Sequence, residues 1–123
     1  MTYHVVDPDD LEATPDRPCE RRSIGEAVGL ENVALNVYRP DPGETVPLAY
    51  HYHDEQEEAF VVLEGVLHVE TPEREYVVEA GETFVAEAGA PHRAFVPEDA
   101  AASAELLAVG APAVDDANVY EGE

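Results

Sequence analysis

Apolar and polar positions alternate with a period of two along much of the chain. In residues 32–38, Val33, Leu35 and Val37 alternate with Asn32, Ala34, Asn36 and Tyr38. This pattern predicts a half-buried β-strand whose valine and leucine face is buried. Further short strands are expected at residues 50–53, 59–63, 66–70, 76–78, 83–86, 93–96 and 106–109. Glycine and proline separate these segments, and such spacing is typical of an all-β sandwich or barrel, so we expect one small β-barrel.

The two ends of the chain lack this regular pattern. Pro8, Pro15 and Pro18 lie among many charged residues, which predicts an irregular N-terminal arm with one short edge strand at residues 3–6. Helical periodicity is absent apart from a short turn expected within residues 97–105. We therefore expect an arm over residues 1–30, the barrel over 31–110 and a C-terminal segment over 111–123.

Composition allows one domain with a real core and excludes several kinds of partner. The chain has 123 residues, of which 45% are hydrophobic, and 28 acidic residues stand against six basic ones for a net charge of -22. A surface of this sign repels phosphates and anionic lipids, so we expect neither nucleic acid nor a membrane as partner. A single cysteine, Cys19, makes no internal disulfide. No apolar run approaches the roughly 18 to 20 residues of a membrane-spanning helix, and the first residues lack the basic and apolar regions of a signal peptide. A reducing cytoplasm is the expected location.

The charge also indicates a habitat. All six basic residues are arginines, and lysine is absent. At ordinary ionic strength such a net charge destabilises a compact state by self-repulsion, whereas at 1 M salt the Debye length falls to about 3 Å. The composition therefore predicts a salt-accumulating halophile, mainly a haloarchaeon, as the source. An acidic protein from a GC-rich bacterium is the alternative.

Three histidines and one glutamate have the spacing of a metal site. His51 and His53 are separated by one residue, so on a strand both side chains project from the same face. Glu58 opens the next apolar run and His92 opens a later strand. Imidazole and carboxylate together suit divalent ions such as Mn, Fe, Co, Ni, Cu and Zn. The apolar residues on the same faces as Glu58 and His92 are expected to line the pocket: Phe60, Val62, Ala94 and Val96.

Two segments that contain these residues resemble the conserved motifs of the cupin superfamily. They are Gly43-x7-His51-x-His53-x4-Glu58-x6-Gly65 and Gly81-x5-Glu87-x-Gly89-x2-His92. The first motif has two extra residues after its glycine, Glu87 replaces the usual proline, and Val96 replaces the usual asparagine. The resemblance implies a jelly-roll-like cupin barrel that holds one divalent transition metal per chain (Fe, Mn, Ni, Cu or Zn). It implies His51, His53, Glu58 and His92 as the four ligands.

The resemblance leaves the function open between three classes. We expect a metal-dependent enzyme of the oxygenase, oxidoreductase or isomerase type that acts on a small organic molecule. The pocket face lacks a proton-transferring side chain other than the ligands, so Glu58, a metal-bound hydroxide or Tyr50 from the rim would be needed. The alternatives are a non-catalytic module that binds or senses a small ligand, and a metal-stabilised structural dimer. The resemblance to small cupins also implies a homodimer in which the two chains exchange a terminal strand. The candidate segments are residues 3–6 and 114–120.

Other reactive side chains have simpler explanations. His68 alternates with Leu67 and Val69, so we expect it to face outward rather than to bind metal. Arg39 and Arg93 lie near the motifs, where a surface ion pair is the expected use rather than substrate binding. Cys19 has no neighbouring catalytic histidine in sequence, which favours a structural thiol.

Overall fold

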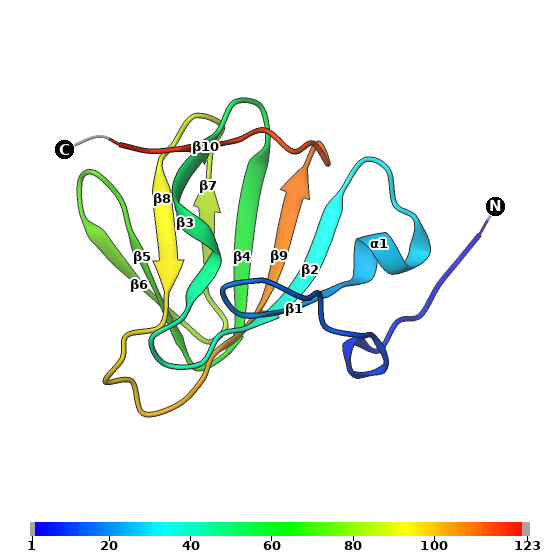
Figure 1. Ribbon diagram of the computed structural model, residues 1–123, viewed down its shortest axis with the longest axis horizontal. Coiled ribbons are helices and arrows are strands. Elements are labelled where there is room, and N and C mark those ends of the chain that lie inside the picture. Colours follow the sequence, from blue (N-terminus) through cyan, green and yellow to red (C-terminus); the bar gives the residue numbers. More distant parts are fainter. Residues whose placement is uncertain (1, 122–123) are drawn as a thin grey trace.

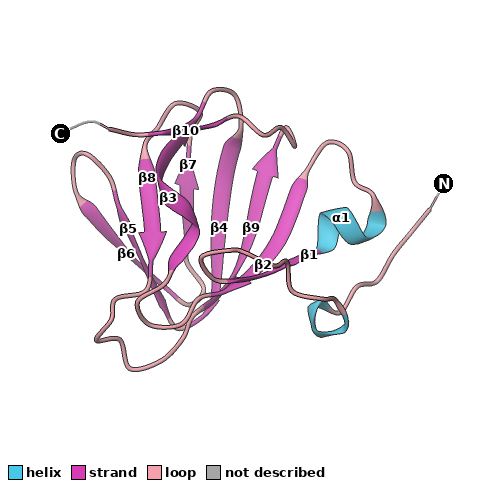
Figure 2. Cartoon of the chain, viewed as in Figure 1, coloured by secondary structure: helices cyan, strands magenta, loops and turns pink. Residues whose placement is uncertain are grey.

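Antiparallel strands are the main regular structure of the chain. The computed structural model describes residues 2–121, apart from the side chains of residues 47 and 48. In this part of the chain it has ten strands: β1 (Glu20–Ser23), β2 (Ala34–Arg39), β3 (Thr45–His53), β4 (Glu57–Glu64), β5 (Val66–Glu70), β6 (Glu75–Glu79), β7 (Thr83–Ala86), β8 (His92–Phe95), β9 (Glu105–Ala111) and β10 (Ala117–Val119). Two short helices, η1 (Pro8–Asp10) and α1 (Ile24–Val28), both precede β2 (Figure 2).

The strands form two five-stranded sheets that enclose the core (Figure 1). The strand order is β1-β2-β9-β4-β7 in one sheet and β10-β3-β8-β5-β6 in the other. Among the described strands, every connection passes from one sheet to the other except β1–β2 and β5–β6, so most neighbours in space are distant in sequence. This double sheet confirms the expected all-β, jelly-roll-like barrel.

Inward-facing apolar side chains from both sheets make the core. Phe60 of β4 and Leu106 of β9 are fully buried in one sheet, and Leu67 and Val69 of β5 are fully buried in the other. Burying each such side chain is worth roughly 1.5 to 3 kcal/mol. Because Leu67 and Val69 point inward, His68 between them points outward, as expected.

The turn between β4 and β5 depends on glycine. Gly65 has a φ of +74°, in the left-handed region that other residues rarely adopt, and a Cβ atom there would lie 2.6 Å from the carbonyl oxygen of Ser103. A larger residue would therefore push apart β4 and the loop that precedes β9.

The N-terminal arm differs from expectation in its secondary structure. Residues 3–6 form no strand, and the arm instead contributes β1, which pairs with β2. The helix α1 was not indicated by periodicity because five residues are too few to show it. Its start is capped by the Ser23 hydroxyl, which accepts a hydrogen bond from the Glu26 amide (3.2 Å), and it ends at Gly29. The turn expected within residues 97–105 is present, where the Ala100 amide donates to the Pro97 carbonyl.

The strand β2 presents the face opposite to the one predicted. Asn36 and Tyr38 point into the barrel, and Val37 is buried on the outer side beside β1 and α1. All three side chains are therefore buried, with 8%, 4% and 4% exposure for Asn36, Val37 and Tyr38. Alternation identifies the inner face only when the outer face meets water, and here the arm covers it.

The C-terminal segment pairs with its own chain. The strand β10, red in Figure 1, pairs antiparallel with β3, so that Ala117 lies opposite His53 and Val119 opposite His51. The edge of β3 is thereby covered without a partner chain. Within residues 2–121 no helix has the length and apolar character needed to span a membrane.

Candidate metal centre

The two sheets bring the four motif residues together at the centre of the barrel. His51 and His53 come from β3 and His92 from β8, and His51 is the direct pairing partner of His92. Their side chains are buried on the inner face of this sheet. Glu58 enters from β4 in the opposite sheet, where its pairing partner on β9 is Gly110. Four side chains therefore meet in one small volume. His51 and His53 share a face of β3, His92 lies beside them on β8, and Glu58 faces them from the other sheet.

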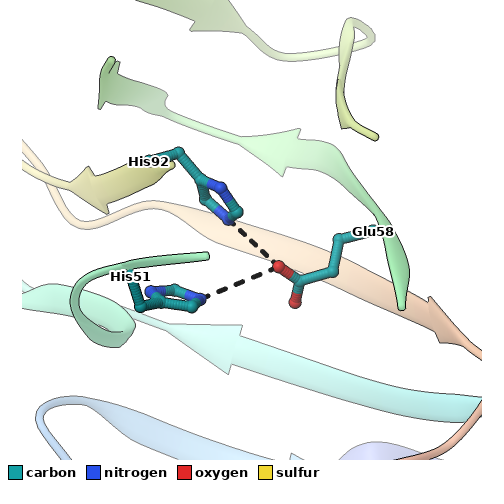
Figure 3. A group of neighbouring side chains, drawn as sticks. All are labelled: His51, Glu58 and His92. Atoms are coloured by element: carbon teal, nitrogen blue, oxygen red, sulfur yellow. Dashed lines mark hydrogen bonds and ion pairs between the residues drawn. The ribbon is translucent and has the colours of Figure 1, made fainter. Parts of the chain in front are cut away.

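The Glu58 carboxylate lies among the three imidazoles. Its Oε1 atom is 3.0 Å from Nε2 of His92, 3.1 Å from Nε2 of His53 and 3.9 Å from Nε2 of His51. Figure 3 shows the carboxylate between His51 and His92. The potential ligand atoms of His51, Glu58 and His92 all lie within 4.8 Å of one another. His53 falls outside this tightest group but contacts the same carboxylate oxygen.

Each imidazole is oriented by an acceptor at its Nδ1 atom. His51 donates to the carbonyl of Ala49 (2.7 Å), and His92 donates to the carbonyl of Ala90 (2.9 Å). His53 donates to the carboxylate of Asp116 (2.8 Å). Because carbonyl and carboxylate oxygens accept, each ring donates from Nδ1 and turns its Nε2 atom toward the centre. Such acceptors behind metal-binding histidines fix the ring and its tautomer.

The chemistry of these donors fits a cation. The Nε2 atoms of His51 and His53 are buried and lack a hydrogen-bond partner among residues 2–121, which is costly for polar groups. Three imidazole nitrogens and one carboxylate oxygen suit a first-row divalent ion and leave coordination positions for a small molecule. A metal ion bound there would give both Nε2 atoms a partner, so the residues of this site fit a divalent metal ion.

Electrostatics keeps the central carboxylate ionised. Burial raises the pKa of Glu58, but its contacts with the three imidazoles outweigh burial and hold this pKa well below the ordinary value. The close Glu58 carboxylate (3.1 Å) and, to a smaller extent, the Asp116 carboxylate raise the pKa of His53 against the effect of burial. The site thus stores a negative charge that attracts a cation.

Asp116, in the loop before β10, is a site residue that the motifs did not indicate. One carboxylate oxygen accepts from His53, and the other accepts from the backbone amides of Glu55 (2.6 Å) and Gln56 (3.0 Å). Burial raises the pKa of Asp116, but these amide hydrogen bonds, followed by the hydrogen bond from His53, together outweigh it and lower this pKa. Gln56 in turn donates to the carbonyl of Pro112 (2.9 Å). Asp116 lies 63 residues from His53, so its role as a positioning residue follows only from the folded chain.

We expect Asp116→Ala to weaken metal binding about 10- to 100-fold, the usual effect of removing a carboxylate behind a histidine ligand. The imidazole of His53 would lose the acceptor that holds its orientation. Affinity for Co²⁺ or Zn²⁺ is measured by competition with a chromogenic chelator. Asp115→Ala is the matched control, because that neighbouring carboxylate is exposed and makes no hydrogen bond in the described part of the chain. Equal affinities of the two variants would contradict the positioning role.

A cavity of about 610 Å³ opens beside this cluster. His53, Gln56, Glu58, Ala108 and Gly110 are among its lining residues, and the Gln56 side chain lies against Gly110. The residues expected to line the pocket lie elsewhere: Phe60, Val62, Ala94 and Val96 are fully buried in the core and are not among this cavity's lining residues. These four side chains pack against other core residues and are fully buried, whereas the cavity is lined by residues of β2 and of the N-terminal arm.

The remaining reactive side chains have structural partners. His68 contacts Glu75 (2.8 Å), Arg93 pairs with Glu70, and Arg39 pairs with Asp9, Glu20 and Glu105. Burial raises the pKa of the Cys19 thiol to about 12, so Cys19 provides no thiolate nucleophile at neutral pH. Tyr50 packs against Tyr120, with ring centres 4.8 Å apart and the ring planes tilted by 35°.

The fold is a jelly-roll barrel, and three histidines from one sheet meet a glutamate from the other inside it. These two features define the class of the protein as a β-barrel with a candidate internal metal centre. The family described as "Cupin domain" matches residues 36–110, which is more than half of the chain. The chain therefore belongs to the cupin family.

Solved structures support the same fold. A sugar phosphate isomerase from a cupin superfamily, from Silicibacter pomeroyi DSS-3, is 26% identical, with 97% of this chain and 83% of that chain covered and a TM-score of 0.81. The polyketide cyclase RemF from Streptomyces resistomycificus is 22% identical, with 99% and 89% covered and a TM-score of 0.79. A predicted oxalate decarboxylase from Thermotoga maritima is 19% identical, with 89% and 99% covered and a TM-score of 0.73. The last two show similarity of fold alone. No curated protein matches the chain.

Proposed function

We propose that this cupin holds one divalent transition metal per chain and acts as a metal-dependent enzyme on a small organic molecule. The ligands would be His51, His53, Glu58 and His92. The observation that carries the proposal is the orientation of the three imidazoles, whose Nδ1 atoms are held by acceptors while their Nε2 atoms converge on one carboxylate.

A transition metal bound there supplies Lewis-acid chemistry and, for a redox-active ion, electron transfer. The residues of the chain would orient the substrate and exclude water. The three histidines are buried, which would shield the metal centre from bulk water. The adjoining cavity has the size of a small-molecule site. Among the reaction types, we favour an oxygenase or other oxidoreductase, with isomerisation as the next candidate. The named activities of the similar structures include isomerase and cyclase, so the shared fold is compatible with several chemistries.

Metal content and turnover test this function. Protein purified in high salt is expected to contain close to one equivalent of a transition metal by elemental analysis. The iron, manganese, nickel or copper form is then mixed with small organic substrates while dioxygen consumption and product formation are followed. Absence of bound metal after reconstitution with each of these ions would contradict the proposal.

A non-catalytic binding module is the second candidate. It is favoured by the surroundings of the centre, because the side chains that pack below it, such as Phe60 and Val62, transfer no proton. A zinc form that binds ligands and turns over none of them would support this reading. A third candidate is a structural dimer that the metal stabilises and that binds no small molecule. In that case, mutations in the cavity would leave the monomer–dimer equilibrium unchanged.

The assembly and setting of the protein are part of the proposal. A homodimer is supported by a row of side chains on the outer face of one sheet, where Val77 is exposed beside His68 and Phe95. Light scattering after size-exclusion chromatography in high salt tests it, and a monomer would contradict it. The acidic composition supports a cytoplasmic setting rich in salt.

A further inference from the structure

A second cavity lies at the end of the barrel that holds the metal centre. Its volume is about 680 Å³, and it shares no lining residue with the cavity beside β2 and β9. It lies where the two sheets end, because β6 and β7 are the last described strands of their sheets and both contribute lining residues. The turn between β5 and β6 and the loop between β7 and β8 form its rim, and both lie at the upper end of the barrel in Figure 1.

Aromatic rings lead from this opening toward the metal centre. Tyr76 of β6, Phe84 of β7 and His92 of β8 all line the cavity. The ring centre of Phe84 lies 5.6 Å from that of Tyr76 and 6.0 Å from that of His92. Tyr76 and Phe84 are half-buried, whereas His92 is fully buried and its Nε2 atom faces the Glu58 carboxylate at 3.0 Å. The three rings therefore form a continuous wall, and the ring of a bound molecule could extend the same kind of contact.

The charged groups around this cavity disfavour an anion. Its lining includes the exposed carboxylates of Glu73 and Glu87 and contains neither lysine nor arginine. Arg74 lies over the ring of Tyr76, 4.4 Å from the ring centre, but is not among the lining residues. Together with the net charge of -22, the two carboxylates repel carboxylate and phosphate groups. In high salt, where the Debye length is about 3 Å, they attract an organic cation only weakly, so contact with the ring wall decides which molecule binds.

Two hydroxyl groups offer polar contacts in this cavity. The hydroxyls of Tyr76 and Thr83 form no hydrogen bond within the described part of the chain. A hydroxyl can both donate and accept, so both groups suit a neutral polar substituent such as a hydroxyl or a carbonyl. Pro72 and Pro91 add apolar surface to the lining. Apolar and aromatic walls with a few polar groups are typical of small-molecule sites.

The rim of the cavity is bonded to the residues of the metal centre. The Gly89 amide donates to the carbonyl of His53 (2.7 Å), and the Ala90 carbonyl accepts from Nδ1 of His92 (2.9 Å). Gly89 and Ala90 both line the cavity. A molecule bound there therefore contacts the segment that orients His92.

We propose that this second cavity binds a neutral molecule that contains an aromatic ring. The ring would pack against Tyr76 and Phe84, a polar substituent would bind the hydroxyls of Tyr76 and Thr83, and the inner edge would lie beside His92. The inference rests on the proposed function, because it names the class of molecule on which the metal centre would act. Binding of the ring itself requires no metal.

Fluorescence titration with 2-naphthol in high salt tests the proposal. The chain has no tryptophan, so the emission of the naphthalene ring can be followed separately. Three compounds compete with it: 2-naphthoate as the anion, 2-naphthylmethylamine as the cation and decahydro-2-naphthol as the saturated counterpart. We expect 2-naphthol to bind about 10-fold more tightly than the anion and the saturated compound, and more tightly than the cation. Tighter binding of either charged compound, or equal binding of the saturated one, would overturn the proposal.

A pair of variants locates the binding site. Phe84→Leu removes a ring but keeps an apolar side chain, and it should weaken 2-naphthol binding about 10-fold. Phe95→Leu is the matched control, because Phe95 is also half-buried but lies on the outer face of β8 and does not line the cavity. Equal effects of the two variants would overturn the site. If Phe84→Leu does not fold, the comparison of compounds on the wild type still decides the proposal.

A second copy of the chain is the competing occupant of this opening. The titration is therefore repeated over a range of protein concentrations. Constant affinity supports a small-molecule site. Affinity that falls as the protein concentration rises would show that another copy covers the cavity, and it would overturn the proposal.

Titration with and without Co²⁺ separates this inference from the proposed function. In the Co²⁺ form, the visible absorption of the ion should shift as the cavity fills, because the segment that orients His92 lines it. An unchanged spectrum at saturation would contradict the contact with His92. Co²⁺ binding without binding of 2-naphthol overturns the inference alone. Selective binding of 2-naphthol by a protein that binds no metal supports the inference and overturns the metal-dependent function.

Discussion

Replacement of His92 by alanine is expected to remove most of the metal from the protein. His92 is fully buried, its Nδ1 atom is held by the Ala90 carbonyl, and its Nε2 atom faces Glu58 at 3.0 Å. Loss of a residue behind the ligands costs about 10- to 100-fold in affinity, so loss of a ligand itself should exceed about 100-fold. His51→Ala, His53→Ala and Glu58→Ala should have the same effect. Metal per chain is measured by elemental analysis after reconstitution and desalting.

His68→Ala is the matched control for these variants. This histidine also has a carboxylate partner, Glu75, but it lies on the outer face of β5 and should leave the metal content unchanged. Thermal unfolding gives a second readout, because an ion present at 1,000 times its dissociation constant stabilises a protein by about 4.1 kcal/mol. The wild type and His68→Ala should show this stabilisation, and the ligand variants should not. Retention of metal by the ligand variants would show that the centre is assigned to the wrong residues.

Dialysis into low-millimolar salt is expected to unfold the protein. The net charge is -22, and the Debye length grows from about 3 Å at 1 M salt to about 30 Å at 0.01 M, so carboxylates across the whole surface repel one another. The structure offers few cations to offset this repulsion. The single guanidinium of Arg39, for example, pairs with three carboxylates, those of Asp9, Glu20 and Glu105. Near-UV circular dichroism of the tyrosines, followed during stepwise removal of salt, reports the loss of packing.

A variant with fewer surface charges makes this test specific. Glu31, Glu64 and Glu73 are exposed and form no ion pair in the described part of the chain. Replacing all three with glutamine should lower the salt concentration at which the signal is lost, because only self-repulsion changes. A native spectrum of the wild type in low-millimolar salt would contradict both the salt dependence and the inferred saline habitat.

Local patterns anticipated much of the fold and the centre of the site. The alternation on β4 placed Glu58, Phe60 and Val62 on one inward face, and the interval between His51 and His53 placed both on one face of β3. Both inferences concern neighbours on a single strand, where the two-residue period of an extended chain determines which side chains share a face. The same rule failed on β2, because it cannot tell which face is covered by a distant segment.

The sequence by itself determined the all-β barrel, the four residues that meet at its centre and the excess of negative charge. Only the tertiary structure decided what surrounds that centre. Asp116 reaches His53 because β10 pairs with β3, and Arg21 and Asn36 line the same cavity as Glu58 because β1, β2, β9 and β4 are successive strands of one sheet. The physical reason is that alternation and motif spacing report contacts within a strand or between adjacent strands. Which strands lie side by side depends on the packing of the whole barrel.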